Sequence, residues 1–343
     1  MRATTIYAPF DVRLETVPDT GLQEPTDALV RVVASCICGS DLWPYRGENP
    51  VKSPRRIGHE FVGVVEAVGA DVRTVSTGDF VVAPFTFSDG TCPNCQAGVQ
   101  SACINGNAWG GPGIDGAQAE AVRVPLADGT LVATPGMPDD ELVPSLLALS
   151  DVMATGWHAA VSARVAPGHT VVVVGDGAVG LSGVLAASRL GAERVIVLSR
   201  NPARQAVAGQ FGATDVIALR GDEAVAAILE LTSDVGADAV LECVGTGESM
   251  TTAIDAARAG ATVGYVGVPH GVELPIRTMF SNNIGVAGGV APVRRYLPEL
   301  MDDVLAGRID PGLVFDLELP LDDVAEGYAA MHERRAIKTL LRP

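Results

Sequence analysis

The hydrophobic pattern of the chain changes character near residue 152. Before it, short apolar stretches such as Ala28–Ala34, Phe61–Ala67 and Phe80–Ala83 alternate with segments that contain Gly and Pro, a pattern typical of strands joined by turns. After it, strand-like runs such as Thr170–Val174 and Arg194–Ser199 alternate with Ala-rich helical runs. This alternation predicts a parallel sheet covered by helices on both faces.

The pattern changes again after residue 288. A helix is predicted at about Val293–Ala306, then a short strand, a second helix at about Leu321–Arg334 and an apolar run at Thr339–Leu341. We expect this segment to return to the first domain. The sequence therefore predicts an α/β protein in which residues 1–151 and 289–343 form a twisted, barrel-like β domain, and residues 152–288 form a doubly wound parallel sheet.

A glycine-rich turn follows the most apolar strand of the second domain. The strand runs into a G-x-G-x-x-G sequence, and a helical run from Leu181 to Leu190 follows at once; the turn consists of Gly175, Asp176, Gly177, Ala178, Val179 and Gly180. Glycines here permit a tight turn, close approach of a pyrophosphate and close helix–strand packing, and a helix N-terminus favours phosphate. We therefore expect a bound dinucleotide, and an ordinary glycine-rich turn is the alternative.

The end of the next predicted strand bears on which dinucleotide is bound. NAD-binding proteins usually place an acidic residue about 20 residues after the turn, where it binds the ribose hydroxyls. Ser199 and Arg200 stand there instead, and Arg204 follows one helical turn later. A carboxylate repels a 2′-phosphate, whereas serine and arginine can donate hydrogen bonds to it. The sequence therefore predicts NADP(H); alternatively, both arginines are solvated residues at a helix start.

Composition restricts the function classes further. The 343 residues carry a formal net charge of −17, which argues against a nucleic-acid or anionic-membrane partner. Neither a membrane-spanning apolar stretch nor a signal peptide is evident, so we expect a cytoplasmic location. In such a chain, the clustering among its six cysteines favours metal binding over disulfide bonds.

Three separated motifs in the first domain suggest a catalytic metal. Cys38 begins Cys-Gly-Ser-Asp, His59 lies in Gly-His-Glu, and Asp151 lies in Ser-Asp-Val-Met-Ala-Thr-Gly. A thiolate, an imidazole and a carboxylate suit a tetrahedral zinc with one open position, where an alcohol oxygen can bind. Taken singly, each residue has a structural alternative, since a lone histidine is often structural and Asp151 can cap the following helix.

Together these motifs resemble the zinc-dependent medium-chain alcohol dehydrogenases, and the resemblance extends over the whole chain. It implies a GroES-like β-barrel catalytic domain and a Rossmann domain, with Cys38, His59 and Asp151 as zinc ligands. It also implies that Glu60 is an acid beside the metal or an alternative ligand, and that Ser40 bonds the substrate oxygen.

The same resemblance implies further roles. Lys338 matches a basic residue that contacts the coenzyme phosphates, and Gly267 and Val268 match backbone that lines the nicotinamide. Many members have a histidine that passes the proton to solvent where this chain has Trp43. We therefore expect Ser40 and the coenzyme ribose to pass the proton to ordered water, with Asp41 or Glu48 as the alternative route. The resemblance also implies a homodimer or homotetramer.

A second cysteine cluster resembles the structural zinc lobe of the family. That lobe normally reads C-x2-C-x2-C-x7-C, and Cys92, Cys95 and Cys103 keep this spacing with Asp89 at the first position. We therefore expect a closed zinc site with one oxygen ligand from Asp89. The alternative is a metal-free lobe in which Asp89 is a turn residue.

The predicted reaction is the reversible oxidation of a primary or secondary alcohol to an aldehyde or ketone, with hydride transfer to NADP⁺. Two alternatives differ in chemistry: a zinc-free NADPH-dependent quinone or enone reductase of the same fold, and a catalytically silent NADPH-binding sensor. The trio of Cys38, His59 and Asp151 argues against both, because neither requires metal ligands.

Overall fold

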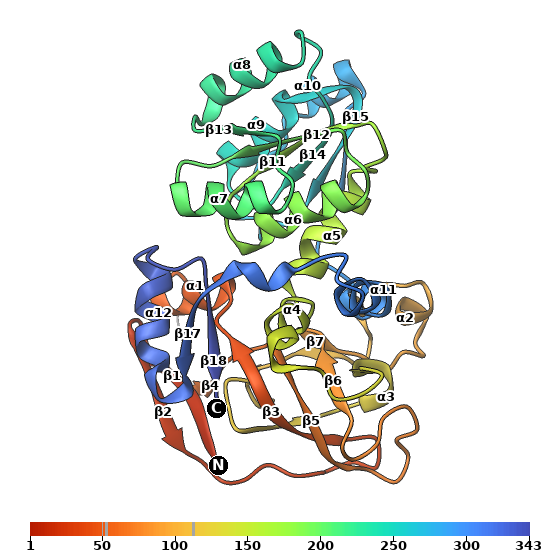
Figure 1. The fold of residues 1–343 in the computed structure, drawn as a ribbon, viewed down its shortest axis with the longest axis vertical. Helices are drawn as coiled ribbons and strands as arrows, with labels where there is room; N and C mark the ends of the chain where they lie inside the picture. The colour runs from red at the N-terminus through yellow and green to blue at the C-terminus, as the bar shows by residue number, and fades with distance from the viewer. Residues whose placement is uncertain (50, 52–53, 112–113) are drawn as a thin grey trace. The chain divides into compact units, whose positions relative to one another are not determined.

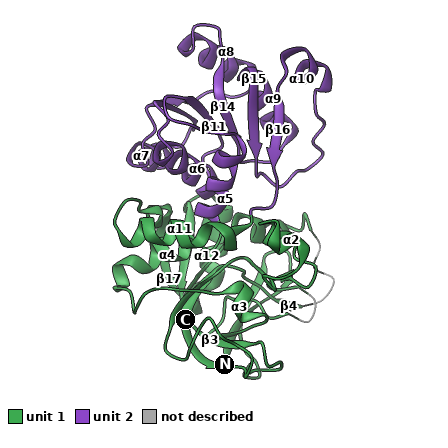
Figure 2. Ribbon diagram, turned by 90° about the vertical axis from the view of Figure 1, so that its right-hand side faces the viewer, with its two compact units in different colours: residues 1–151, 292–343 green, residues 152–291 purple. Residues whose placement is uncertain are grey.

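In a computed structural model, which describes residues 1–49, 51, 54–111 and 114–343, the chain divides into two compact units. One unit contains Met1–Asp151 and Pro292–Pro343, and the other contains Val152–Ala291 (Figure 2). The first boundary coincides with that of the predicted division. The chain returns to the first unit at Pro292, whereas the prediction placed the return at residue 289.

The first unit is rich in β-strands. They are β1 (Arg2–Ala8), β2 (Asp11–Thr16), β3 (Ala28–Cys36), β4 (Arg55–Arg56), β5 (Phe61–Val68), β6 (Phe80–Ala83), β7 (Thr86–Phe87), β8 (Asn107–Ala108), β9 (Ala121–Val124), β10 (Val132–Ala133), β17 (Phe315–Pro320) and β18 (Lys338–Arg342). The largest sheet has the order β10-β6-β5-β3-β18-β17, and β9 also pairs with β3. Because β18 pairs antiparallel with β3, the C-terminal apolar run joins this sheet within the first unit, the domain to which we expected it to return.

Short helices connect these strands. They are η1 (Gly39–Asp41), α1 (Leu42–Arg46), α2 (Pro93–Gln96), η2 (Gln100–Ala102), α3 (Ala127–Thr130), η3 (Asp140–Leu142), α4 (Val143–Ala148), α11 (Val293–Leu305), η4 (Pro311–Val314), η5 (Leu321–Asp323) and α12 (Val324–His332). Two of them position the first site: η1 begins directly after Cys38, and α4 ends shortly before Asp151. The core contains Trp109, whose ring lies 5.3 Å from that of Phe61.

The second unit is a doubly wound parallel sheet. Its elements are α5 (Val152–Ser162), β11 (Thr170–Val174), α6 (Ala178–Arg189), β12 (Arg194–Leu198), α7 (Pro202–Gln210), β13 (Asp215–Ile217), α8 (Gly221–Leu231), β14 (Ala237–Glu242), α9 (Gly247–Asp255), β15 (Ala257–Tyr265), α10 (Ile276–Asn282) and β16 (Gly285–Gly288). The strand order β13-β12-β11-β14-β15-β16 is that of a Rossmann sheet, and helices cover both of its faces (Figure 1).

None of the helices within the described residues has the length and apolar character needed to cross a membrane. The cytoplasmic location inferred from the sequence stays a prediction.

Candidate metal and coenzyme sites

Four side chains from three segments of the first unit converge on one point. Cys38 follows β3, His59 and Glu60 precede β5, and Asp151 follows α4. Each offers a possible ligand atom, and these atoms all lie within 4.8 Å of one another. The structure therefore brings together the three predicted zinc ligands and the predicted neighbouring acid.

Two separations within this group, both to Asp151, match the edges of a metal tetrahedron. Zinc bond lengths of about 2.3 Å to sulfur and about 2.1 Å to nitrogen and oxygen place tetrahedral S···O and N···O pairs about 3.6 and 3.4 Å apart. The Cys38 Sγ and Asp151 Oδ2 atoms are 3.6 Å apart, and the His59 Nε2 and Asp151 Oδ2 atoms are 3.4 Å apart. The residues present therefore fit a zinc ion.

The electrostatics of the group also favour a cation. Burial and the charge of Asp151 raise the pKa of Cys38. Burial opposes protonation of His59, but the nearby Asp41 and Cys38 outweigh it and raise the pKa of His59 well above its usual range. Because a divalent ion stabilises a thiolate, a carboxylate and a neutral imidazole together, it would relieve both effects.

Asp41 holds both the cysteine and the histidine segments. Its Oδ2 atom accepts a hydrogen bond of 3.0 Å from the backbone N–H of Cys38, and its Oδ1 atom lies 3.4 Å from Nδ1 of His59. Gln118 donates to the same carboxylate at 3.4 Å and accepts from the Tyr328 hydroxyl at 3.2 Å. A carboxylate on the far nitrogen of a ligating histidine fixes its orientation. The sequence prediction did not include this role, although the Cys-x-x-Asp spacing resembles that of a cap.

Glu60 is linked to the last strand of the unit. Its Oε1 atom accepts a hydrogen bond of 2.6 Å from Nζ of Lys338, which also donates to the carbonyl of Ile37 at 3.2 Å. Within the described part of the chain, the buried Oε2 atom of Glu60 has no hydrogen-bond partner, so it is available to a metal. The contacts of Lys338 compete with its predicted role at the coenzyme phosphates, which stays a prediction.

Ser40 lies in η1, two residues after Cys38, and is exposed. Trp43 lies in α1 and is half-buried. The carboxylate of Asp41 is occupied by Cys38, His59 and Gln118, which makes it an orienting group rather than a route to solvent. The role of Ser40 at the substrate oxygen stays a prediction.

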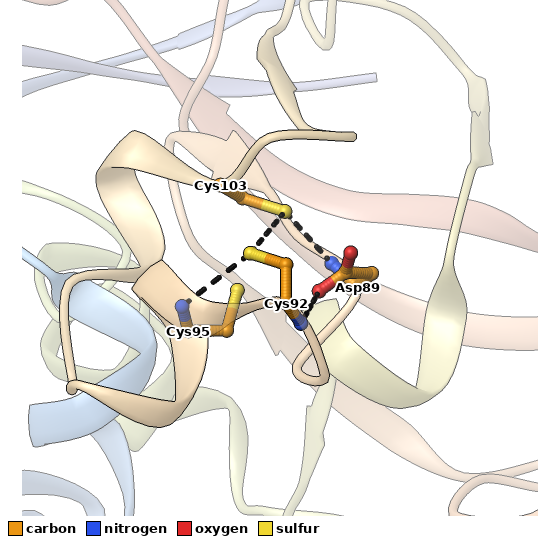
Figure 3. Close-up of side chains that lie close together, drawn as sticks. All are labelled: Asp89, Cys92, Cys95 and Cys103. Atoms are coloured by element: carbon orange, nitrogen blue, oxygen red, sulfur yellow. Dashed lines mark hydrogen bonds between the residues drawn. The ribbon is translucent and has the colours of Figure 1, made fainter.

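The second predicted cluster is also assembled. Asp89, Cys92, Cys95 and Cys103 place their possible ligand atoms within 4.8 Å of one another, and their side chains point toward one centre (Figure 3). The Sγ atoms of Cys92 and Cys103 are 3.9 Å apart, too far for a disulfide of about 2.05 Å but close to the tetrahedral S···S edge of about 3.8 Å around zinc.

Backbone hydrogen bonds hold the Asp89 carboxylate of this cluster in its ionised form. The backbone N–H groups of Thr91 and Cys92 donate to Oδ1 of Asp89 at 2.8 and 2.9 Å. Partial burial opposes ionisation of Asp89, but these N–H groups outweigh it and lower its pKa well below the usual range. Burial raises the pKa of Cys95 to about 12. A metal that binds this thiol would therefore have to displace its proton. The donor set fits a closed zinc site with one oxygen ligand.

The glycine turn of the second unit has the conformation that its sequence predicts. Gly175 has a φ of +120°, and a Cβ on Gly180 would lie 2.1 Å from the carbonyl oxygen of Gly175. A Cβ on Gly177 would meet no atom within 4 Å. The space over Gly177 and the N-terminus of α6 thus suit a pyrophosphate.

The premise of the NADP(H) prediction, that no carboxylate lies at the end of β12, is wrong for the folded chain. Asp176 reaches this position from the glycine turn: its Oδ2 atom accepts a hydrogen bond of 2.9 Å from the Ser199 hydroxyl. Its Oδ1 atom lies 3.1 Å from the guanidinium of Arg204. Of the three predicted 2′-phosphate ligands, Arg200 is exposed, and the other two are buried against Asp176. The choice of coenzyme stays a prediction.

The turn that contains Gly267 and Val268 is supported by a buried acid that the sequence analysis missed. Glu242, the last residue of β14, accepts through Oε1 from the backbone N–H groups of Val244 and Gly245 at 2.9 and 2.8 Å. Its own carbonyl accepts from the N–H of Gly267 at 3.2 Å. A Cβ on Gly267 would lie 2.2 Å from the nitrogen of Gly245, so only glycine permits this packing. The sequence feature that could have indicated this role is the position of Glu242 at the end of a largely apolar strand.

Comparison with known proteins matches successive parts of the chain. Two family models match it, the alcohol dehydrogenase GroES-like domain over residues 24–136 and zinc-binding dehydrogenase over residues 178–306. The chain is 38% identical over 349 residues to the "Probable zinc-binding alcohol dehydrogenase Rv1895" of Mycobacterium tuberculosis, and the match covers 100% of this chain and 89% of that protein.

Solved structures give the same result. The alcohol dehydrogenase TADH from Thermus sp. ATN1 matches with a TM-score of 0.93 and 34% identity over 100% of this chain and 99% of that one. A Sinorhizobium meliloti protein, described as a zinc-binding dehydrogenase bound to NADP, matches with a TM-score of 0.83 and 27% identity over 100% and 99% of the two chains. The predicted fold class, a GroES-like domain with a Rossmann domain, is confirmed.

Proposed function

Since this chain belongs to the zinc-dependent medium-chain alcohol dehydrogenase family, we propose that it interconverts a primary or secondary alcohol and the corresponding aldehyde or ketone, with NADP(H) as hydride carrier. The observation that carries the proposal is the convergence of Cys38, His59 and Asp151, in which the Cys38–Asp151 and His59–Asp151 separations are those of a zinc tetrahedron. Glu60 lies in the same group with one free carboxylate oxygen, as far as the described residues show.

These side chains divide the chemical roles. Cys38, His59 and Asp151 would hold zinc, which when bound lowers the pKa of an alcohol oxygen and polarises a carbonyl in the reverse direction. Asp41 fixes the His59 ring, so that the imidazole is already oriented before a ligand arrives. Ser40, exposed beside Cys38, would accept a hydrogen bond from the alcohol and pass the proton to ordered water.

The cluster of Cys38, His59, Glu60 and Asp151 also argues against the zinc-free reductase and the silent sensor. A thiol, an imidazole and two carboxylates whose possible ligand atoms lie within 4.8 Å of one another form a donor set that suits a metal ion. Neither alternative gives such a group a role.

The proposed coenzyme is supported by two observations. Arg200 is exposed at the end of β12, where a guanidinium can bind a 2′-phosphate. The similar Sinorhizobium meliloti protein is described as bound to NADP. Gly177 and the N-terminus of α6 would hold the pyrophosphate, and a bound coenzyme supplies the hydride acceptor.

We also propose that a second copy of this chain is its partner. The edge strand β16 ends the parallel sheet, and an unpaired strand edge is a surface on which an identical edge can pair. Near it in the sequence, Ile276 and Phe280 of α10 and Val290 are 63%, 85% and 64% exposed. If these side chains form one surface with the strand edge, that surface has the apolar character of an association site.

The test combines metal analysis with turnover. The purified protein is expected to contain about two zinc ions per chain and to reduce NADP⁺ with members of a panel of primary, secondary and polyhydric alcohols. Cys38→Ser should lose one zinc and alcohol oxidation while it keeps coenzyme binding. Cys36→Ser, which changes a buried thiol in the adjoining strand, is the matched control and should keep both zinc ions. Alcohol turnover that survives Cys38→Ser would refute the metal assignment.

A further inference from the structure

Asp176 belongs to the glycine turn, but its carboxylate lies beside Ser199, directly after β12. Parallel pairing places Val174 opposite Leu198, so the residues that follow each strand leave the same edge of the sheet side by side. Asp176 therefore meets Ser199, with 2.9 Å between Oδ2 and the hydroxyl. A carboxylate is present where Rossmann proteins place the acid that binds the ribose hydroxyls, but it comes from a different strand end.

Ser199 and Arg204 both hold this carboxylate in place. Besides Ser199, the guanidinium of Arg204 contacts both the carboxylate, at 3.1 Å, and the backbone carbonyl of Asp176, at 3.3 Å. The side chains of Arg204 and Asp176 are only 10% and 15% exposed. The pair is therefore largely shielded from water. Charge interactions in such a shielded position are stronger than at an open surface.

We propose that Asp176 is the residue that sets coenzyme selectivity, and that its carboxylate disfavours a 2′-phosphate relative to a 2′-hydroxyl. An ionised carboxylate accepts a hydrogen bond from a hydroxyl and repels a phosphate. It also occupies Ser199 and Arg204, two of the donors that a 2′-phosphate would need, and leaves Arg200 as the exposed cation. Removal of the Asp176 charge should free Arg204 for the phosphate.

This inference deepens the proposed function and rests on it for the identity of the site as a coenzyme site. It does not depend on whether the native chain prefers NADP(H) or NAD(H), because it concerns the direction in which one carboxylate shifts that preference.

The experiment measures binding of coenzyme fragments rather than turnover. The full chain is titrated calorimetrically with 5′-AMP and with 2′,5′-ADP, which differ only in the 2′-phosphate, and the ratio of their dissociation constants is compared between variants. Asp176→Asn keeps the shape and a hydrogen bond to Ser199 but removes the charge. It should improve binding of 2′,5′-ADP relative to 5′-AMP by about tenfold, the size expected for one nearby unit charge.

Two further variants make the result specific. Asp238→Asn is the matched control, because Asp238 also forms an ion pair with an arginine, Arg258, at 2.7 Å. Asp238 lies near the start of β14, at the amino ends of the parallel strands, whereas Asp176 lies at their carboxyl ends. The ratio of dissociation constants for this control should equal that of the wild type. Arg204→Gln leaves the Asp176 charge without its cation and should weaken 2′,5′-ADP selectively. In the Arg204→Gln background, Asp176→Asn should give a smaller gain, which a double-mutant cycle measures.

The outcomes separate the two proposals. An Asp176→Asn ratio within about twofold of the wild-type ratio, a difference of only about 0.4 kcal/mol, would overturn the role of Asp176, whatever the enzyme oxidises. A wild type that prefers 5′-AMP, together with the expected Asp176→Asn shift, would overturn the choice of NADP(H) and support the role of Asp176. Absence of alcohol turnover together with that shift would overturn the dehydrogenase proposal and again support Asp176.

Discussion

Lys338 and Glu60 form an ion pair of 2.6 Å whose side chains are 1% and 0% exposed. The pair joins the last strand of the chain, β18, to the segment that carries His59. Burial raises the pKa of Glu60, and the charge of Lys338 acts in the opposite direction. The C-terminal strand thus supplies the cation that permits a carboxylate beside the candidate metal site.

Removal of one member of this pair should destabilise the protein strongly. Lys338→Met leaves the Glu60 carboxylate buried without a cation, which we expect to lower the free energy of unfolding by about 3 kcal/mol. The double variant Lys338→Met/Glu60→Gln removes both charges and should recover most of the loss. Urea unfolding followed by tryptophan fluorescence measures both. Equal losses in the single and double variants would show that the charge pairing is not the cause.

Asp89→Asn should separate the two possible roles of Asp89. The amide oxygen can still accept from the N–H groups of Thr91 and Cys92, which Oδ1 binds now, so the turn should persist. The amide is a poor zinc ligand, and we expect zinc in this lobe to be released to a chelator at least about tenfold more readily. Metal analysis after dialysis against the chelator measures the change. Full retention of the lobe zinc would mean that Asp89 serves only the turn.

Asp41→Asn should weaken the catalytic metal site without removing a ligand. The variant keeps an acceptor for the N–H of Cys38 but loses the charge beside Nδ1 of His59. We expect zinc affinity to fall about tenfold to a hundredfold, as measured by competition with a chromogenic chelator. Asp128→Asn is the control, because Asp128 also accepts hydrogen bonds from backbone N–H groups, those of Arg73 and Thr74. Removal of the Asp128 charge should leave zinc affinity unchanged. A lower melting temperature with unchanged zinc affinity would contradict the orienting role.

The parts of the site that could be predicted are those encoded by local spacing. The turn at Gly175–Gly180 follows a strand and opens a helix, and Cys92, Cys95 and Cys103 keep fixed intervals, so short-range geometry restricts both. The same holds for the alternation of strands and helices after residue 152. The final predicted helix was less accurate: its first turn is the separate segment η5, and α12 covers only Val324–His332.

The parts that could not be predicted depend on register between distant segments. Asp176 meets Ser199 because β11 and β12 pair with Val174 opposite Leu198, and the hydrophobic pattern of two buried parallel strands does not specify that register. The contact of Lys338 with Glu60 likewise requires β18 to lie beside β3. Asp176 is distant from residue 199 along the chain and reaches it only through this pairing of strands.

Phe280→Asp should disrupt self-association. Phe280 is 85% exposed on α10, and a charge at the centre of an apolar contact between two copies would be buried without a partner. Light scattering should give the wild type a mass that is a multiple of 35.3 kDa and the variant the single-chain mass. Met137→Asp alters another exposed apolar side chain, 64% exposed in the first unit, and should leave the mass unchanged. A variant that keeps the wild-type mass would place the contact elsewhere.

Asp238 should contribute an acid-sensitive part of the stability of the second unit. Partial burial opposes its ionisation, but the N–H of Thr170 and the guanidinium of Arg258 outweigh this and lower its pKa. A lowered pKa in the folded state means that the stabilisation is present above the unfolded-state pKa of about 3.9 and is lost as the pH falls through the lower folded value. Asp238→Asn should therefore cost about 1 kcal/mol at neutral pH, and the difference from the wild type should disappear in acid. Urea unfolding at a series of pH values from neutral downward measures this difference. A gap between the two proteins that stays constant with pH would show that Asp238 acts through packing rather than through its charge.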